Sequence, residues 1–316
     1  MSNYRKLTGY AASAAIACLA WSAPGLAAPY YEGKTITVLV GYGAGGASDL
    51  SARAIVKHLS QYVPGKPEMI VKNMTGGGGV KAFNFLYESA KPDGLTLQFG
   101  AFSPISQVVD APGLRVRFDE LTIAGATVTP GGLAMYARTD AAPAGMKQPA
   151  DIVKATDLKF GGIGPGAIPD VVGRLTLLAL ETPFRYIPGY QGSIKVVNAV
   201  RSGEANMAVA PLSTYRQVVE PNMIAAGEAI GVMYWGSQGD NGVIVKNPLI
   251  PELPTFNEVY QSIHGKAPSG LAYEALVFNT NILNNASHLM WGPPGMEKEA
   301  VAAIREGMKH VINDPN

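Results

Sequence analysis

A strand, a glycine-rich turn and the start of a helix follow one another directly near the beginning of this chain. Residues 35–40 read Thr-Ile-Thr-Val-Leu-Val, and residues 41–46 read Gly-Tyr-Gly-Ala-Gly-Gly. Apolar and β-branched residues suit a strand buried on both faces, and glycines let the backbone turn without a Cβ clash. The first N–H groups of the following helix lack intrahelical partners and lie at the positive end of its dipole. The sequence therefore predicts a site for a carboxylate or phosphate that needs no lysine.

Residues 1–27 are typical of a secretory signal peptide. Arg5 and Lys6 precede an apolar run, and small residues end the segment at Ala27. The run is short for a membrane span, and no later segment supplies about 18 uninterrupted apolar residues. A lipoprotein leader ending before Cys18 is an alternative, although the apolar run continues past this cysteine. We expect cleavage after Ala27 and a periplasmic protein.

Composition excludes several kinds of site and partner. Cys18 is the one cysteine and would leave with the signal peptide, so we expect neither disulfides nor thiolate metal sites. Lys and Arg number 25 against 24 Asp and Glu, and no basic cluster stands out. This balance argues against nucleic acid as a partner. Motifs for zinc and calcium are also missing from the sequence, so we expect no metal and no other cofactor.

The order of predicted elements indicates two α/β units. Strands joined by helices and short links imply a parallel sheet with right-handed crossovers in the first unit. Glycine turns at 41–46, 73–79 and 161–166 each follow a strand, where ligands of open α/β sheets bind. We therefore expect a cleft closed from both sides. The expected strands lie at 35–40, 69–72, 95–99, 133–136 and 158–160, and the expected helices at 49–62, 80–86, 151–155 and 171–178.

Sequence motifs disfavour two enzyme classes, although a dinucleotide-binding oxidoreductase stays a minor alternative. Gly41, Gly43 and Gly46 satisfy the dinucleotide-binding spacing, but the next strand ends in Lys72-Asn73 instead of the acidic residue that binds ribose. A dinucleotide-binding oxidoreductase is therefore disfavoured. A hydrolase is disfavoured because no G-x-S-x-G elbow occurs and no catalytic motif surrounds the four histidines. We therefore expect that the protein is not an enzyme. The histidines are His58, His264, His288 and His310, and for His288 we expect a helical or packing role.

Several separated motifs occur in a specific order along the chain. They are Val40–Asp49, Ala52-Arg53, Asn73 with its glycine run, Pro92–Gly94, Phe160–Asp170, Tyr186–Pro188 with Gly192, Gly203–Asn206 and Leu253–Thr255. Together they resemble the substrate-binding proteins of tripartite tricarboxylate transporters, the TctC or Bug family. The resemblance covers nearly all of the chain after residue 27, and the order and spacing of the motifs carry it.

The resemblance implies a type II periplasmic binding protein fold, with two doubly wound α/β lobes and a ligand cleft between them. Family members hold a ligand carboxylate largely through backbone amides and ordered waters. When the family's ligand contacts are transferred to the matching positions of this sequence, the first-lobe contacts are Tyr42, Gly43, Ala44, Gly45, Gly46 and Asp49. Asp49 either orders the loop by accepting hydrogen bonds or only caps the helix.

The second lobe departs from the family pattern. Gly162, Ala167 and Asp170 stand where the family usually carries two serines and a histidine. Without those side chains, backbone N–H groups are the donors that remain in this turn. We expect those of Ile163, Gly164, Ala167 and Ile168 to point into the ligand cleft. Ser103, after the third strand, and Tyr190, in the second-lobe loop, are expected to complete the ligand site.

The expected lobe boundaries follow from where the chain crosses over. We expect the first lobe to comprise 28–130 and 235–316 and the second to comprise 131–234. The function implied is capture of a small organic carboxylate by a monomer and its delivery to membrane permease subunits. A ligand-sensing subunit for a signalling partner is the alternative. The ligand stays open among dicarboxylates, tricarboxylates, aromatic acids and amino acids.

Overall fold

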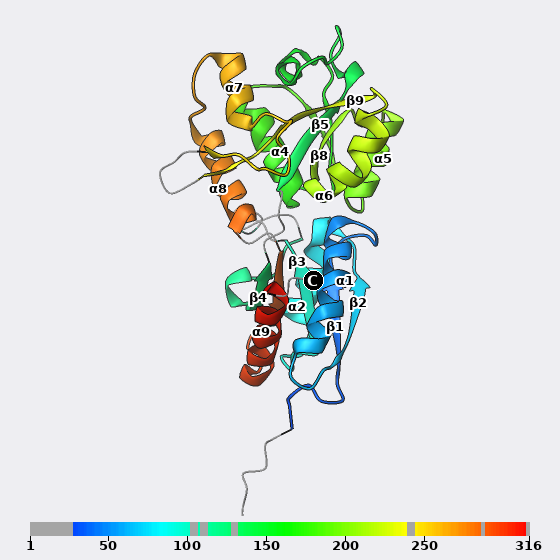
Figure 1. Ribbon diagram of the computed structural model, residues 1–316, viewed down its shortest axis with the longest axis vertical. Coiled ribbons are helices and arrows are strands. Elements are labelled where there is room, and N and C mark those ends of the chain that lie inside the picture. Colours follow the sequence, from blue (N-terminus) through cyan, green and yellow to red (C-terminus); the bar gives the residue numbers. More distant parts are fainter. Residues whose placement is uncertain are drawn as a thin grey trace, which may run out of the picture.

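Two five-stranded sheets form the cores of two lobes stacked along the long axis of the molecule (Figure 1). This computed structural model describes residues 28–101, 107, 113–127, 132–238, 244–285 and 288–313. The signal peptide expected over 1–27 and the site residue Ser103 lie outside the described residues. Within them, no helix has the length and apolar character needed to cross a membrane.

The first sheet has the strand order β2-β1-β3-β12-β4. Strand β1 pairs in parallel with β2 and β3, which confirms the strand–helix–strand prediction for this part of the chain. Strand β12 returns late in the sequence and runs antiparallel between β3 and β4. The strands are β1 (Thr35–Val40), β2 (Glu68–Asn73), β3 (Thr96–Gly100), β4 (Thr122–Thr127) and β12 (His288–Gly292), and the helices of this lobe are α1 (Ala47–Tyr62), α2 (Val80–Glu88) and α9 (Lys298–Asn313).

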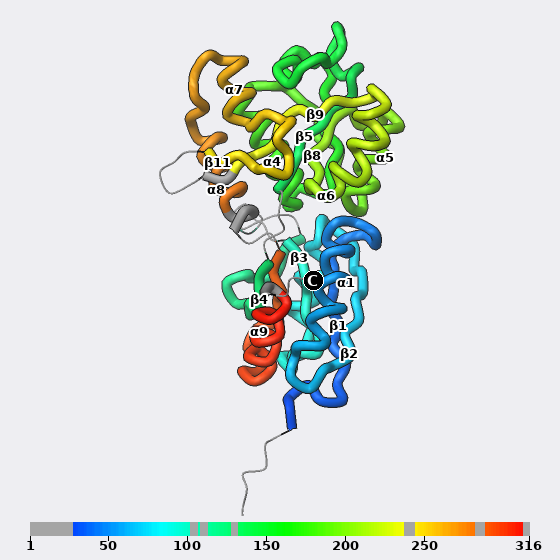
Figure 2. Tube along the Cα trace, in the orientation of Figure 1, coloured from blue at the N-terminus to red at the C-terminus, as the bar shows by residue number. Residues whose placement is uncertain are grey.

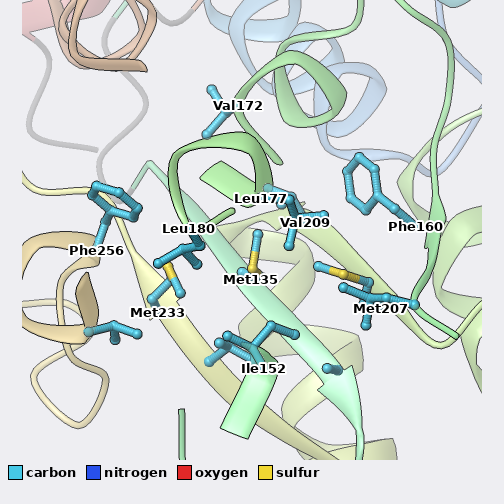
Figure 3. Packing of buried hydrophobic residues seen from close by; sticks show 14 of the residues in the cluster. Met135, Ile152, Phe160, Val172, Leu177, Leu180, Met207, Val209, Met233 and Phe256 are labelled. Atoms are coloured by element: carbon cyan, nitrogen blue, oxygen red, sulfur yellow. The ribbon is translucent and has the colours of Figure 1, made fainter. Parts of the chain in front are cut away.

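The second sheet has the order β7-β6-β8-β5-β9. Its core lies between the sheet and α4, where Met135, Phe160, Leu177 and Val209 are buried together (Figure 3). Its strands are β5 (Leu133–Arg138), β6 (Lys159–Gly161), β7 (Arg185–Ile187), β8 (Met207–Pro211) and β9 (Ala229–Tyr234). The helical segments that follow these strands are Pro149–Lys154, α4 (Ile168–Ala179), α5 (Ser193–Ser202), the one-turn α6 (Leu212–Thr214) and a π-helical segment, Tyr215–Ile224.

The lobe boundary expected after residue 234 differs from the packing that the structure shows. A short hairpin, β10 (Ser237–Gln238) and β11 (Ile244–Val245), leads into α7 (Phe256–His264) and α8 (Leu271–Asn285). Both helices flank the upper lobe, whereas α9 lies beside the lower sheet (Figure 2). The reason is burial, because Trp235, Phe256 and Leu276 belong to the same apolar cluster as the second sheet. The chain rejoins the first sheet only at His288.

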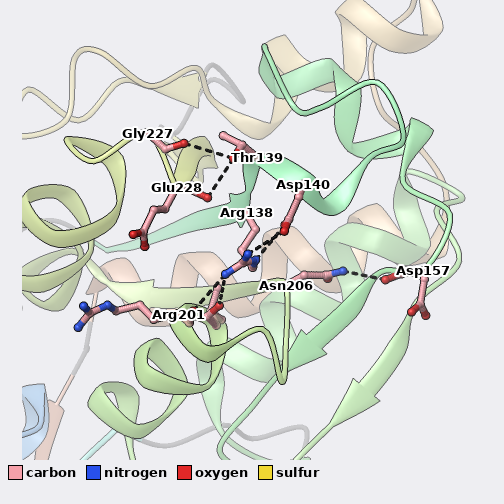
Figure 4. A network of polar contacts seen from close by, with 9 residues as sticks. Arg138, Thr139, Asp140, Asp157, Arg201, Asn206, Gly227 and Glu228 are labelled. Atoms are coloured by element: carbon pink, nitrogen blue, oxygen red, sulfur yellow. Dashed lines mark hydrogen bonds and ion pairs between the residues drawn. The ribbon is translucent and has the colours of Figure 1, made fainter.

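A network of polar contacts ties together the end of the second lobe farthest from the first (Figure 4). The Arg138 guanidinium donates to both carboxylate oxygens of Asp140, at 2.8 and 2.7 Å, and to the carbonyl oxygens of Val200 and Arg201. The Asn206 amide donates to the carbonyl oxygen of Asp157 at 2.8 Å. Because Arg138 ends β5 and Leu133 begins it, these contacts hold the strand at the end away from the first lobe.

Replacing Leu276 by alanine tests the assignment of α8 to the second lobe. Leu276 is 1% exposed against the second core, so the variant should lose about 3 kcal/mol of unfolding free energy. Phe278 lies on the same helix but is 54% exposed, so Phe278→Ala is the matched control and should cost far less. Urea titrations measure both values. Equal losses from the two variants would contradict the assignment.

Candidate functional site

A cavity lies between the two lobes, at the carboxyl ends of their parallel strands. It encloses about 800 Å³ of space, its open mouth included. The first turns of three helices line it: α1 from the first lobe, and α4 and α5 from the second. Figure 1 shows α1 rising from the lower lobe toward α6. The lining residues are Tyr42, Gly46, Ala47, Ser48, Ser51, Ala101, Gly132, Leu133, Ile163, Ile168, Pro169, Gly192, Ser193, Pro211, Leu212, Ser213 and His288.

The Asp49 carboxylate holds the first glycine turn, residues 41–46, through a hydrogen bond. Its carboxylate accepts hydrogen bonds from the Gly45 N–H at 2.9 Å, from Arg53 Nε at 3.0 Å and from Asn73 Nδ2 at 2.9 Å. Asn73 Nδ2 also donates to the carbonyl oxygen of Tyr42 at 2.9 Å. Burial acts to raise the pKa of Asp49, but these hydrogen bonds outweigh it and hold the pKa below its usual value. The N-cap of α1 is Gly46, with no side-chain cap, so of the two roles open for Asp49 the structure shows the ordering of the loop.

The Asp170 carboxylate holds the third glycine turn, residues 161–166, in a similar way. Its Oδ2 atom accepts from the Gly164 N–H at 2.8 Å and from the Tyr186 hydroxyl at 2.6 Å. Burial raises its pKa to about 7, against the lowering effect of these hydrogen bonds and of the Arg174 charge. Asp170 does not line the cavity, so the structure does not place its carboxylate where a donor group of a ligand would meet it.

The two turns share a sequence pattern that the sequence analysis missed. In each lobe an aspartate is the third residue of the helix, and an arginine follows four residues later. Arg53 pairs with Asp49, and Arg174 donates to the backbone carbonyl of Asp170. An Asp-x-x-x-Arg comparison between the two glycine turns would have revealed this internal repeat.

Most of the backbone amides expected to bind a ligand already have partners in the protein. The N–H groups of Gly45 and Gly164 donate to the two aspartates. Those of Gly43, Gly46 and Ala167 donate to backbone carbonyl oxygens. The amide role expected for these residues is therefore not available in this conformation, because the turns satisfy their own donors first.

The first turns of these three helices contain amides with no acceptor among the described residues. They belong to Ala47, Ser48 and Asp49 in α1, to Ile168 in α4, and to Ser193 and Ile194 in α5. Such N–H groups carry the positive end of the helix dipole. All but Asp49 and Ile194 belong to residues that line the cavity. Of the second-lobe amides expected at the site, only Ile168 is among them.

The remaining expected site residues divide into three groups. Tyr42, Gly46 and Ile163 line the cavity with Ile168. Gly164 and Tyr190 line a second interlobe hollow, formed with the glycine run that follows β2, and Tyr42 and Ile163 border this hollow too. The others line neither: Gly43, the exposed Ala44 and Gly45, and the buried Asp49 and Ala167.

His288 is a cavity residue to which the sequence analysis assigned a helical or packing role. Its ring is stacked on Phe99, with the ring centroids 5.2 Å apart, and its Nε2 lies 3.2 Å from Ser48 Oγ. Burial lowers the pKa of His288 to about 4, so the ring is neutral at pH 7. No motif surrounds this residue in the sequence, and only the return of β12 to the first sheet brings it to the cavity.

The two lobes touch through glycine backbone. The Gly43 N–H donates to the carbonyl oxygen of Gln191 across the lobe boundary at 3.2 Å. A Cβ on Gly43 would lie 2.5 Å from that oxygen, and one on Gly164 would lie 3.2 Å from the Cα of Gly78 in the other lobe. The contact therefore depends on the absence of side chains at these positions.

Comparison with known proteins supports this architecture. No family model matches the chain. The UPF0065 protein of the TAR-I ttuE-ttuC′ intergenic region of Agrobacterium vitis is 25% identical over 288 residues, which are 90% of this chain and 73% of that protein. MatC from Rhodopseudomonas palustris with bound malate has a TM-score of 0.66 and 20% identity, over 89% of this chain and 85% of MatC. The periplasmic binding protein BugD has a TM-score of 0.65 and 19% identity, over 90% and 85% of the two chains.

The chain has the fold of the Bug-type periplasmic binding proteins. The resemblance expected from the sequence and the α/β fold class are confirmed at this level. Among the described residues, no group of three or more His, Cys, Asp or Glu side chains is placed to hold a metal ion.

Replacing Asp170 by asparagine should change how stability depends on pH. The folded-state pKa of about 7 exceeds the ordinary value of 3.8, so the protonated carboxyl stabilises the fold below pH 3.8 and this contribution is lost as the pH rises through about 7. Between pH 5 and pH 8 the wild type should lose about 2 to 3 kcal/mol from this group, and Asp170→Asn should not.

Asp49→Asn is the matched control, because the pKa of Asp49 is shifted downward. Its stabilising contribution is present above pH 3.8 and is lost only as the pH falls further, so Asp49→Asn should cost the same at pH 5 and pH 8. Urea midpoints of the three proteins at both pH values measure these differences. A pH-independent cost of Asp170→Asn would show that Asp170 is charged throughout this range.

Proposed function

We propose that this protein is a periplasmic solute-binding protein that captures a small organic carboxylate and delivers it to permease subunits of a tripartite tricarboxylate-type transporter. The observation that carries the proposal is the convergence of free first-turn amides from both lobes on one cavity. The malate bound to MatC, a structural neighbour, supports an organic acid as the ligand class. The signal peptide expected over 1–27 supports export to the periplasm, and we expect the exported protein to act as a monomer.

The ligand carboxylate is bound by main-chain N–H groups instead of a basic side chain. Ala47 and Ser48 approach from α1, and Ile168 and Ser193 approach from α4 and α5. No Lys or Arg occurs among the described lining residues. Hydrogen bonds from amides to an ionised oxygen are stronger than neutral ones, and three helix dipoles add to them. Binding then needs no covalent step and no cofactor.

Binding draws the lobes together because the amides belong to both of them. A ligand that contacts α1 and α4 at once has a higher affinity for the closed form than for the open form, and it shifts the equilibrium by that difference. The glycine contacts between Gly43 and Gln191 and between Gly78 and Gly164 allow the backbones to meet at closure.

Replacing Ala47 by proline removes one amide donor at the first position of α1. Proline is favoured there, and Gly46 already has the extended backbone that a following proline requires. Affinity for acids should fall roughly 10- to 100-fold, the loss of one charge-assisted hydrogen bond. The control is Ala47→Val, which adds similar bulk and keeps the N–H group.

Calorimetry with the processed protein measures these affinities. The panel comprises malate, adipate, hexanoate, benzoate and glutamate, with uncharged hexanamide as the comparison ligand. If Ala47→Pro and Ala47→Val bind the tightest acid with equal affinity, the Ala47 amide does not contribute to ligand binding. If hexanamide bound and none of the acids did, the proposed function would be wrong.

Replacing Gly43 by alanine should weaken all ligands by one common factor. The added Cβ would clash with the Gln191 carbonyl only when the lobes are closed, so about a tenfold loss of affinity is expected. The exposed neighbour Ala44 supplies the control Ala44→Ser, which should bind as the wild type does. Small-angle scattering with saturating ligand should show that Gly43→Ala closes less completely. Unchanged affinity and closure would rule out this contact as part of the closed form.

A further inference from the structure

The wall of the cavity contributed by the first lobe carries one neutral polar pair, Ser48 and His288. Ser48 Oγ lies 3.2 Å from His288 Nε2, and both residues line the cavity. The stacked contact with Phe99, at an angle of 6° between the rings, fixes the plane of the imidazole. Helix α1 and strand β12, 240 residues apart in the sequence, thus place two hydrogen-bonding groups side by side.

The remainder of the cavity is poor in groups that would stabilise a second charge. No Lys, Arg, Asp or Glu is among the described lining residues, and much of the wall is aliphatic. His288 is 9% exposed, and its burial keeps the imidazole uncharged at neutral pH. The aliphatic side chains are those of Ala101, Leu133, Ile163, Ile168 and Leu212. A second carboxylate would lose its hydration here and would have to share the first-turn amides with the first one, because no basic side chain among the described lining residues supplies a counter-charge.

The pair also discriminates among neutral groups. A serine hydroxyl has one donor and two acceptor positions, and a neutral imidazole is a donor at one nitrogen and an acceptor at the other. If His288 Nε2 accepts the Ser48 proton, the serine oxygen can only accept from a ligand. If Nε2 carries the proton, the serine hydroxyl is free to donate. A ligand hydroxyl pairs with Ser48 in both states, whereas a carbonyl or carboxylate oxygen pairs in one.

We propose that the ligand is a hydroxy acid with a single carboxylate and an aliphatic body, and that Ser48, positioned by His288, binds its hydroxyl group. This inference rests on the proposed function, because the carboxylate is bound by the first-turn amides. Ser48 thereby selects among organic acids, and the aliphatic wall excludes those with a second charge.

Four six-carbon acids test the proposal on the processed protein by calorimetry. They are hexanoate, 2-hydroxyhexanoate, 6-hydroxyhexanoate and adipate, which share a chain length and differ in one group. One hydroxyhexanoate should bind roughly five- to tenfold more tightly than hexanoate, as one added neutral hydrogen bond allows. Adipate should bind roughly 100-fold more weakly than that hydroxy acid.

Variants then assign the hydroxyl preference to the pair. Ser48→Ala should reduce the ratio of the hexanoate and hydroxyhexanoate dissociation constants to about one, and His288→Gln should reduce it partly. A merely structural defect would weaken the binding of both acids equally and leave the ratio of their dissociation constants unchanged. Ser213, a lining serine of the second lobe, supplies the control Ser213→Ala, which should keep the wild-type ratio.

The outcomes separate this inference from the proposed function. The proposal of a hydroxy acid with a single carboxylate is wrong if adipate binds more tightly than both hydroxy acids, or if neither hydroxy acid binds more tightly than hexanoate. The proposed binding of carboxylates stands in both cases. A wild-type ratio in Ser48→Ala would overturn the role of Ser48. If none of the four acids binds but hexanamide does, the proposed function fails as well.

Discussion

In each lobe a buried aspartate accepts hydrogen bonds from the glycine turn that opens the neighbouring helix. Asp49 and Asp170 are each 1% exposed, and their carboxylates bind the amides of Gly45 and Gly164. These bonds fix the turns, and the turns set where α1 and α4 begin. The position of the free first-turn amides, and so the shape of the cavity, depends on this pair of contacts.

The same contacts reconcile acidic residues with a site for an anion. A carboxylate pointing into the cavity would repel a bound acid. Here each negative charge is turned back toward its own loop, and in the first lobe Arg53 compensates it from the solvent side. In the second lobe burial raises the pKa of Asp170 to about 7, which reduces its charge near neutral pH. The amide dipoles of the helices thus act on the cavity without direct competition from a carboxylate.

The sequence allowed the strand and helix order of the first lobe and the presence of interlobe glycine turns to be predicted, because these depend on local patterns. The exact donors could not be predicted, since they depend on side-chain geometry. The Gly45 amide donates to the Asp49 carboxylate, which the distant Asn73 also contacts, whereas the Ala47 amide has no acceptor among the described residues. The attachment of α7 and α8 to the second lobe was missed because both lobes offer apolar surface. His288 was missed because its role depends on long-range strand pairing.

Thr127 and His288 are register partners on the neighbouring strands β4 and β12. The chain leaves the first sheet after Thr127 and returns to it at His288, so both connections to the second lobe start from the same corner. Such a paired exit favours bending about a single line over twisting or sliding of one lobe past the other. Because His288 at this corner also lies 3.2 Å from Ser48, a ligand bound to Ser48 as proposed would lie directly beside the place where the chain passes between the lobes.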